Sequence, residues 1–182
     1  MVKKRVIIEG FRGFKKPATL RYPAEPSIPP KGYRGKPEFD AQKCIGCGAC
    51  AQACPTRAIE LKDDENERKL TLSYVHCAFC GRCQDACPED AIHLISEYEL
   101  ATFARENAFT EVKLQLLKCS NCGRPFIPSS QVDAATRRTK DTLEKYRIDV
   151  NEAKALYSIC PNCRITLDEM AKRKLFLLRL RK

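Results

Sequence analysis

Eight of the twelve cysteines lie in two runs that have the same spacing. Each run reads C-x₂-C-x₂-C-x₃-C-P, so that proline follows the last cysteine. The first run contains Cys44, Cys47, Cys50 and Cys54, and the second contains Cys77, Cys80, Cys83 and Cys87. This spacing is typical of cysteines that ligate cubic [4Fe–4S] clusters. Because such clusters carry single electrons, the two runs indicate electron transfer.

Two runs of this kind predict two clusters with crossed ligands. Where such runs occur together, the fourth cysteine of each run ligates the cluster of the other run. We therefore expect one cluster on Cys44, Cys47, Cys50 and Cys87, and a second on Cys77, Cys80, Cys83 and Cys54. The crossing places the two clusters close together, as electron transfer between them requires. The alternative is a purely structural role for the clusters.

The remaining four cysteines form two C-x-x-C pairs, Cys119 with Cys122 and Cys160 with Cys163. Two such pairs are typical of one closed tetrahedral site for a single metal ion. We predict zinc in a structural role. Iron is the alternative, because sulfur-only tetrahedral sites serve both metals. Metal binding would then supply much of the folding energy of this part of the chain.

Disulfides are the alternative use of these cysteines. The regular C-x-x-C spacing favours metal ligation, and we expect no signal peptide, so the reducing cytoplasm is the expected compartment. The longest uninterrupted apolar stretch near the C-terminus is Leu175 to Leu178. That is far short of the roughly 20 residues that a membrane-spanning helix requires. We therefore expect a chain that reaches a membrane only peripherally, through a complex.

The sequence around the two cysteine runs repeats with a period of 33 residues, so that Pro55 to Ile59 matches Pro88 to Ile92. Each half predicts a strand, a ligand loop, a short helix and another strand. Strands are expected over 59–61 and 70–74, on either side of a charged turn. The pattern predicts an α+β fold whose core, residues 38–95, is a bacterial ferredoxin-like domain for two [4Fe–4S] clusters.

The core is flanked by two segments of different character. Residues 1–37 form a basic, proline-rich arm, and six prolines between 17 and 37 exclude a long helix there. Residues 1–16 suggest an amphipathic surface helix, with a strand over 5–8 as the competing prediction. Residues 96–182 are predicted to form a helical module stapled by the four-cysteine site.

Three helices are expected in that C-terminal module. The capping box Ser96-x-x-Glu99 predicts a helix over 97–107. A second helical stretch covers 131–157. A further capping box, Thr166-x-x-Glu169, predicts a C-terminal helix with one apolar and one basic face.

Charge is unevenly distributed along the chain. Residues 1–36 carry a net charge of +8 and residues 164–182 carry +5, whereas the residues between them carry −3. Basic ends suit docking on an acidic subunit, on anionic lipid or on nucleic acid, and a solvated surface is the plain alternative. Nucleic acid is not expected as a partner, because few aromatic residues are interleaved and no groove-reading motif is present.

Motifs for bond-making chemistry are missing from the sequence. It contains no serine elbow, no phosphate-binding loop and no H-E-x-x-H, and its histidines are His76 and His93. We therefore expect a non-catalytic subunit that receives electrons from one protein and delivers them to another.

Several short segments resemble one known family. These are Tyr22-Pro23, Arg34-Gly35-Lys36-Pro37, Cys44-Ile45-Gly46-Cys47, Cys77-Ala78-Phe79-Cys80-Gly81-Arg82-Cys83 and Ser96-Glu97-Tyr98-Glu99-Leu100-Ala101. They resemble the two-cluster ferredoxin-like subunit of energy-converting membrane-bound hydrogenases, which is similar to the corresponding subunit of respiratory complex I. The later cysteine pairs, Cys119 to Phe126 and Cys160 to Cys163, resemble the formate hydrogenlyase type, and the complex I subunit ordinarily lacks them.

The resemblance implies a place in a hetero-oligomeric electron chain. A formate dehydrogenase module or a soluble ferredoxin would supply electrons. They would leave to the proximal cluster in the small subunit of a [NiFe] hydrogenase, whose large subunit reduces protons. Membrane-arm subunits would hold the assembly at the inner face of the cell membrane. A complex I-like quinone oxidoreductase subunit and a free ferredoxin are the alternatives.

Overall fold

The computed structural model describes residues 4–15, 19–25, 27–166 and 171. Residues up to Tyr33 form one compact unit, and residues from Arg34 onward form a second. The first unit contains helix α1 (Lys4–Lys15), which confirms the predicted helix over the competing strand. Its apolar residues Val6, Phe11 and Phe14 are exposed within this unit. The apolar face of α1 therefore does not pack against a hydrophobic core in this unit.

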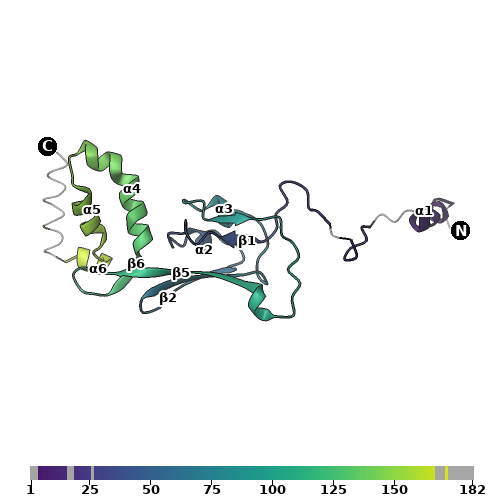
Figure 1. Ribbon diagram of the computed structural model, residues 1–182, viewed down its shortest axis with the longest axis horizontal. Helices are drawn as coiled ribbons and strands as arrows, with labels where there is room; N and C mark the ends of the chain where they lie inside the picture. The colour runs from purple at the N-terminus through teal and green to yellow at the C-terminus, as the bar shows by residue number, and fades with distance from the viewer. Residues whose placement is uncertain (1–3, 16–18, 26, 167–170, 172–182) are drawn as a thin grey trace. The chain divides into compact units, whose positions relative to one another are not determined.

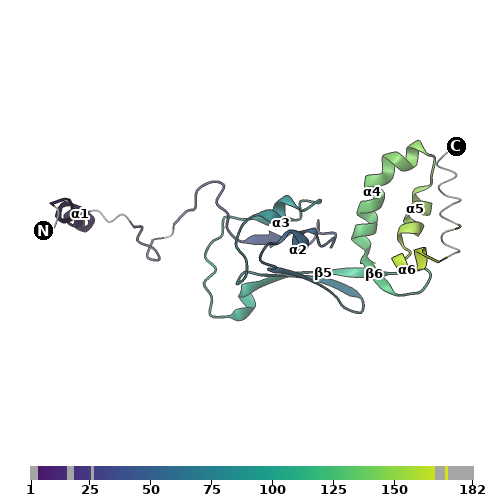
Figure 2. The same ribbon diagram turned by 180° about the vertical axis from the view of Figure 1, so that it is seen from behind.

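Two antiparallel sheets organise the second unit (Figures 1 and 2). The smaller sheet pairs β1 (Pro37–Phe39) with β4 (Ile92–Leu94). The larger sheet has four strands in the order β2-β3-β5-β6. These are β2 (Ile59–Asp63), β3 (Glu67–Ser73), β5 (Phe109–Lys118) and β6 (Pro125–Pro128). The two strands predicted around the charged turn are present and pair antiparallel, and they extend further into that turn than expected, to Asp63 and from Glu67.

The core lies between the two sheets and the cysteine loops. Leu70 and Leu72 of β3 are almost completely buried, because alternate residues of a strand point to the same face. Ala58 and Ala91 are equally buried and stand 33 residues apart, at equivalent positions of the repeat. Several half-buried cysteines of the two runs pack against this core. The apolar core therefore also forms the walls around the cysteine thiols.

Short helices follow the first two cysteines of each run and contain the third, namely α2 (Ala49–Ala53) with Cys50 and α3 (Arg82–Asp85) with Cys83. The longer helices belong to the C-terminal part and are α4 (Ser129–Lys145), α5 (Val150–Tyr157) and α6 (Pro161–Arg164). The helical stretch predicted over 131–157 is thus two helices, because the chain turns at Arg147, whose φ is 53°. The turn lets α4 and α5 lie side by side (Figure 1).

The helix predicted over 97–107 is wrong. The chain has no regular structure from Ser96 to Ala104, a 3₁₀ turn covers Arg105–Ala108, and β5 follows. The backbone there bonds across the chain: Lys36 N–H donates to the Glu97 carbonyl at 2.8 Å, and Ile95 N–H donates to the Lys36 carbonyl at 3.0 Å. Lys36 also pairs with the Glu97 carboxylate at 2.6 Å. These tertiary bonds hold the segment in a non-helical conformation, so the helix predicted from the capping box does not form. The helix predicted after Thr166 lies almost wholly outside the described residues.

Strand β5 joins the two parts of the chain that the sequence analysis divided at residue 95. It belongs to the predicted C-terminal module, but from Phe109 to Gln115 it pairs with β3 of the ferredoxin-like core. The cysteine runs and the later helices are therefore carried by one continuous sheet. Among the described residues, no helix has the length and apolar character needed to cross a membrane.

Gly35 supports a mutation test of the pairing around Lys36. A Cβ atom at Gly35 would lie 2.3 Å from the carbonyl oxygens of both Ile95 and Glu97. Because these are backbone atoms, Gly35→Ala is expected to cost about 3 kcal/mol, the upper part of the range for overpacking. Denaturant unfolding under anaerobic conditions measures the loss. Gly10→Ala is the control, since a Cβ there meets nothing within 4 Å. Equal midpoints for the two variants would contradict the close approach at Gly35.

Candidate cluster and metal sites

The 33-residue repeat extends to the backbone conformation. Left-handed φ values occur at Gly46 and Phe79, at Gly48 and Gly81, and at Arg57 and Asp90, and the members of each pair are 33 residues apart. Positive φ is uncommon for an aromatic residue, so Phe79 adopts it because the loop geometry requires it. Gly48 and Gly81 begin the helices α2 and α3. The two cysteine loops therefore have the same shape as well as the same spacing.

Two cavities lie beside these loops. The first cavity is lined by Cys44, Cys47, Cys50 and Cys87. The second cavity is lined by Cys77, Cys80, Cys83 and Cys54. Each cavity thus brings three cysteines of one run together with the fourth cysteine of the other. These are the two groups that the sequence predicted, although the ligation itself stays a prediction.

Apolar side chains complete both cavities. Phe39, Leu70 and Ile92 line the first cavity, and Ile59, Leu72 and Leu94 line the second. Cys47 and Cys80 are exposed, so each cavity has one thiol at the surface. A mostly apolar wall with one exposed edge limits water access while leaving a short route to a partner protein.

Backbone N–H groups point at the cysteine sulfurs. Ala58 N–H donates to Cys54 Sγ and Ala91 N–H donates to Cys87 Sγ, both at 3.2 Å. Phe79 N–H donates to Cys77 Sγ at 3.4 Å. Such bonds favour a thiolate and are among the interactions that tune iron–sulfur centres.

Burial raises the pKa of four of these thiols, namely Cys44, Cys50, Cys77 and Cys83. It raises the pKa of Cys50 to about 12 and that of Cys83 to about 11. At Cys54 burial also acts to raise the pKa, but bonds from the Thr56 hydroxyl and the Ala58 N–H outweigh it and the pKa is lowered. Because ligands must lose their protons, a metal or cluster entering these cavities has to displace them. The donor set of four thiols per cavity fits a [4Fe–4S] cluster.

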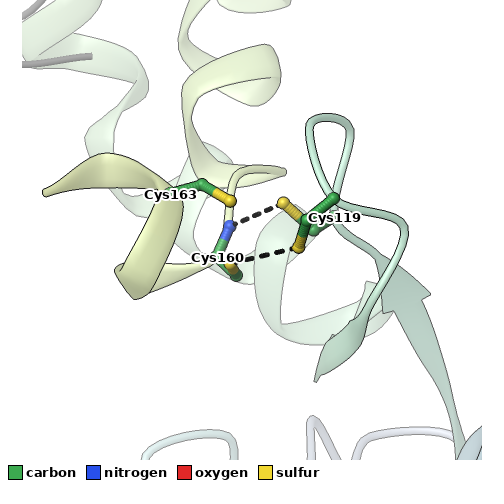
Figure 3. A group of neighbouring side chains, drawn as sticks. Cys119, Cys160 and Cys163 are labelled. Carbon is green, nitrogen blue, oxygen red and sulfur yellow. Dashed lines mark hydrogen bonds between the residues drawn. The ribbon is translucent and has the colours of Figure 1, made fainter. Parts of the chain in front are cut away.

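The four later cysteines form a much tighter group (Figure 3). The sulfurs of Cys119, Cys122, Cys160 and Cys163 all lie within 4.8 Å of one another. Cys122 and Cys160 Sγ are 3.7 Å apart. A tetrahedral ion with metal–sulfur bonds of about 2.3 Å places its sulfurs about 3.8 Å apart. The group therefore fits one metal ion, and among the described residues it is the one set of thiols gathered this closely.

Two tight turns build this group. Cys119 follows the end of β5, and Gly123, with a φ of 70°, lets its N–H return to the Cys119 carbonyl at 2.9 Å. Cys160 caps α6, whose first residue is Pro161. Burial acts to raise the pKa of Cys119, but N–H donors led by Cys160, at 3.2 Å, lower it to about 6. These N–H donors therefore favour the thiolate form of Cys119, the form that binds a metal.

Some residues that hold the cysteine loops lie outside any motif. Arg68 of β3 donates to the Gly46 carbonyl at 3.0 Å and pairs with both oxygens of Asp63 at 2.6 and 2.7 Å. Arg137 and Arg138 of α4 pair with Glu89 beside Cys87. Sequence analysis missed all three arginines, because each reaches its loop only through the folded sheet or helix.

Comparisons with known proteins agree with this arrangement. Residues 43–91 match the family described as 4Fe-4S dicluster domain. Formate hydrogenlyase subunit 6 of Escherichia coli (strain K12) is 40% identical over 149 residues, which cover 81% of each chain. NADH-quinone oxidoreductase subunit I of Carboxydothermus hydrogenoformans is 43% identical over 60 residues, 31% of this chain and 43% of that protein.

Among solved structures, one chain of the archaeal membrane-bound sulfane sulfur reductase is 37% identical. It covers 59% of this chain and 58% of its own, with a TM-score of 0.45. The resemblance noted in the sequence is confirmed by the long match to the bacterial subunit, which extends well beyond the two cysteine runs. The chain belongs to the family of formate hydrogenlyase subunit 6.

Proposed function

We propose that this chain is a non-catalytic electron-transfer subunit of a membrane-bound complex of the formate hydrogenlyase type. The observation that supports it best is the pair of cavities, each lined by three cysteines of one run and the fourth of the other. When bound there, a [4Fe–4S] cluster accepts and releases one electron at a time. The shared core keeps the two cavities close together, as a relay requires.

In this proposal the first cluster is held by Cys44, Cys47, Cys50 and Cys87, and the second by Cys77, Cys80, Cys83 and Cys54. The chain contributes position, apolar walls and N–H donors. Ala58 and Ala91 bond equivalent sulfurs at the same distance, so the repeat gives both sites the same basic scaffold. Differences between the sites then come from side chains that differ between the two halves of the repeat and from the elements that contact them.

The proposed partners follow from the family. Electrons would arrive from a formate dehydrogenase module or a ferredoxin and leave to the small subunit of a [NiFe] hydrogenase, next to its large subunit. The match to formate hydrogenlyase subunit 6 supports this choice, since it covers most of both chains. A complex I-like quinone oxidoreductase is the second candidate, supported by the shorter match to a subunit I. The long flanking segments argue against a free ferredoxin.

For the four later cysteines we propose a single structural zinc ion, with iron as the alternative. The close grouping of their sulfurs supports one tetrahedral ion. Cys119, Cys160 and Cys163 are themselves the buried core of this region, packed with Phe126 and Ile159. Because there is so little apolar packing around them, the ion would be the main source of local stability.

We also propose that α1 touches the membrane surface at the cytoplasmic face. The helix combines exposed Val6, Phe11 and Phe14 with basic side chains, including Lys4 and Arg12. Helices with one apolar and one basic face bind in the interface of anionic bilayers. The subunit would therefore be peripheral, held by its complex and by this helix.

Purification of the tagged full chain from its native host under anaerobic conditions tests the proposed function. Subunits of a [NiFe] hydrogenase are expected to copurify, together with nickel, from the membrane fraction. Mass spectrometry and metal analysis identify them. Copurification with quinone oxidoreductase subunits, without nickel, would support the second candidate instead. A small, uncomplexed species on gel filtration would favour the free carrier and contradict both.

A further inference from the structure

The two halves of the repeat differ beside the fourth cysteine of each run, at Thr56 and Glu89 and at the next pair, Arg57 and Asp90. Thr56 and Glu89 are equivalent, since each comes two residues after its cysteine and 33 residues separate them. Thr56 Oγ1 lies 3.6 Å from Cys54 Sγ, so this side chain faces its own cysteine. Glu89 instead lines the first cavity with Cys87 and Pro88. The first cavity thus has a carboxylate where the second has a hydroxyl.

Two arginines of α4 bind this carboxylate. Arg137 Nη2 lies 2.7 Å from Glu89 Oε2, and Arg138 Nη2 lies 2.5 Å from Glu89 Oε1. Arg138 Nη2 also donates to the Pro88 carbonyl at 3.1 Å. The Glu89 side chain is only 16% exposed, whereas the arginines are 65% and 50% exposed. The carboxylate is therefore enclosed and the positive charges are partly screened by water.

The strands before α4 pack against the first cysteine loop. A Cβ atom at Gly46 would lie 2.9 Å from Pro128 Cγ of β6 and 2.6 Å from Leu114 Cδ1 of β5, and α4 begins directly after Pro128. Gly46 and Glu89 both line the first cavity, so residues of β5, β6 and α4 all contact its wall.

We propose that Arg137 and Arg138 are positioning residues that neutralise Glu89 and thereby raise the reduction potential of the cluster in the first cavity alone. The inference rests on the proposed function, because it requires a cluster there. Reduction adds one electron and no proton, so it is opposed by a nearby unpaired carboxylate and favoured by net positive charge. The module that carries the four-cysteine site would in this way adjust one of the two clusters.

Redox titration of the anaerobically reconstituted full chain, followed by electron paramagnetic resonance, tests the proposal. The reductant is dithionite, and Cys80→Ser identifies the signal of the second cluster. The double variant Arg137→Gln/Arg138→Gln is expected to lower the midpoint of the first cluster. We expect its reduced-to-oxidised ratio at a fixed potential to fall about threefold, or about 30 mV at 59 mV per tenfold for one electron. The second cluster should not change.

Three further variants isolate the cause. Arg137→Lys/Arg138→Lys keeps the charges and should keep the wild-type midpoint. Lys140→Gln/Lys145→Gln removes the same charge from the same helix without touching Glu89, and should change neither cluster. Glu89→Gln should move the first midpoint upward, which tests the proposal even if the double arginine variant does not fold.

Unchanged midpoints, or equal shifts of both clusters, would overturn the inference. Iron content separates this failure from that of the proposed function. If the wild-type chain holds about eight irons but the midpoints do not respond, the role of the arginines is wrong. If the wild-type chain cannot be loaded with two clusters, the proposed function itself is wrong.

Discussion

Replacing Cys54 by alanine is expected to destroy the cluster of the second run, although Cys54 itself belongs to the first run. The physical reason is the crossing of the cavities, in which Cys54 lies with Cys77, Cys80 and Cys83. Its sulfur is fixed there by the Ala58 N–H and by Thr56. Removing it leaves the second cavity with three thiols and the first cavity with all four.

Two double variants distinguish crossed from uncrossed ligation. If ligation is crossed, Cys54→Ala/Cys77→Ala damages one cluster only and should leave about four irons in an intact cubane. Cys54→Ala/Cys44→Ala damages both clusters and should leave no intact cubane. Uncrossed ligation reverses the two results. Iron analysis and Mössbauer spectroscopy of anaerobically reconstituted protein give the answer, and Thr56→Val, which keeps all eight cysteines, is the matched control.

The cysteine spacing predicted more of this molecule than any other feature. It determined which four cysteines share each cavity, because the repeat imposes the same loop shape twice, even at Phe79, where the backbone adopts a glycine-like conformation. Strand β5 was not predicted, although a period-2 signal is present: Val112 and Leu116 are buried, while Lys113 and Gln115 are exposed. The segment was interpreted only through the cysteine pair that follows it, so its alternation was not recognised as a strand pattern.

Tertiary bonding explains the remaining failures. The capping box at Ser96 is locally sound, but the Glu97 carbonyl and carboxylate are both taken by Lys36, which lies far away in sequence. Likewise, the ion pair between Glu89 and Arg137 could not be predicted from local sequence, because 48 residues separate the two. A short-range pattern describes the secondary structure that an isolated segment prefers. Where helix and extended structure differ little in energy, tertiary contacts with distant residues decide between them.

Loss of the single metal ion is expected to unfold the end of the C-terminal module while sparing both clusters. Cys160→Ser removes one of the four proposed ligands, a residue whose N–H also donates to Cys119 Sγ. The buried cluster around this site consists of Cys119, Cys160 and Cys163, with Phe126 and Ile159 packed against it, so little apolar packing remains there without the ion. Binding of structural zinc contributes on the order of 10 kcal/mol to the folding of small zinc modules. The surface ion pair between Lys154 and Asp133 contributes about 1 kcal/mol at most, so it cannot compensate for loss of the ion.

Limited trypsin digestion measures this unfolding. Cleavage after Arg147 and Lys154 should accelerate strongly in Cys160→Ser, and metal analysis should show one ion fewer. Asn162→Ala is the matched control, because this exposed residue lies between Cys160 and Cys163 and leaves every thiol in place. Zinc in the wild-type chain would support a structural ion, whereas visible absorption from iron would favour the alternative. If Cys160→Ser resists trypsin as well as the control does, the module is held by packing and the ion is dispensable for its fold.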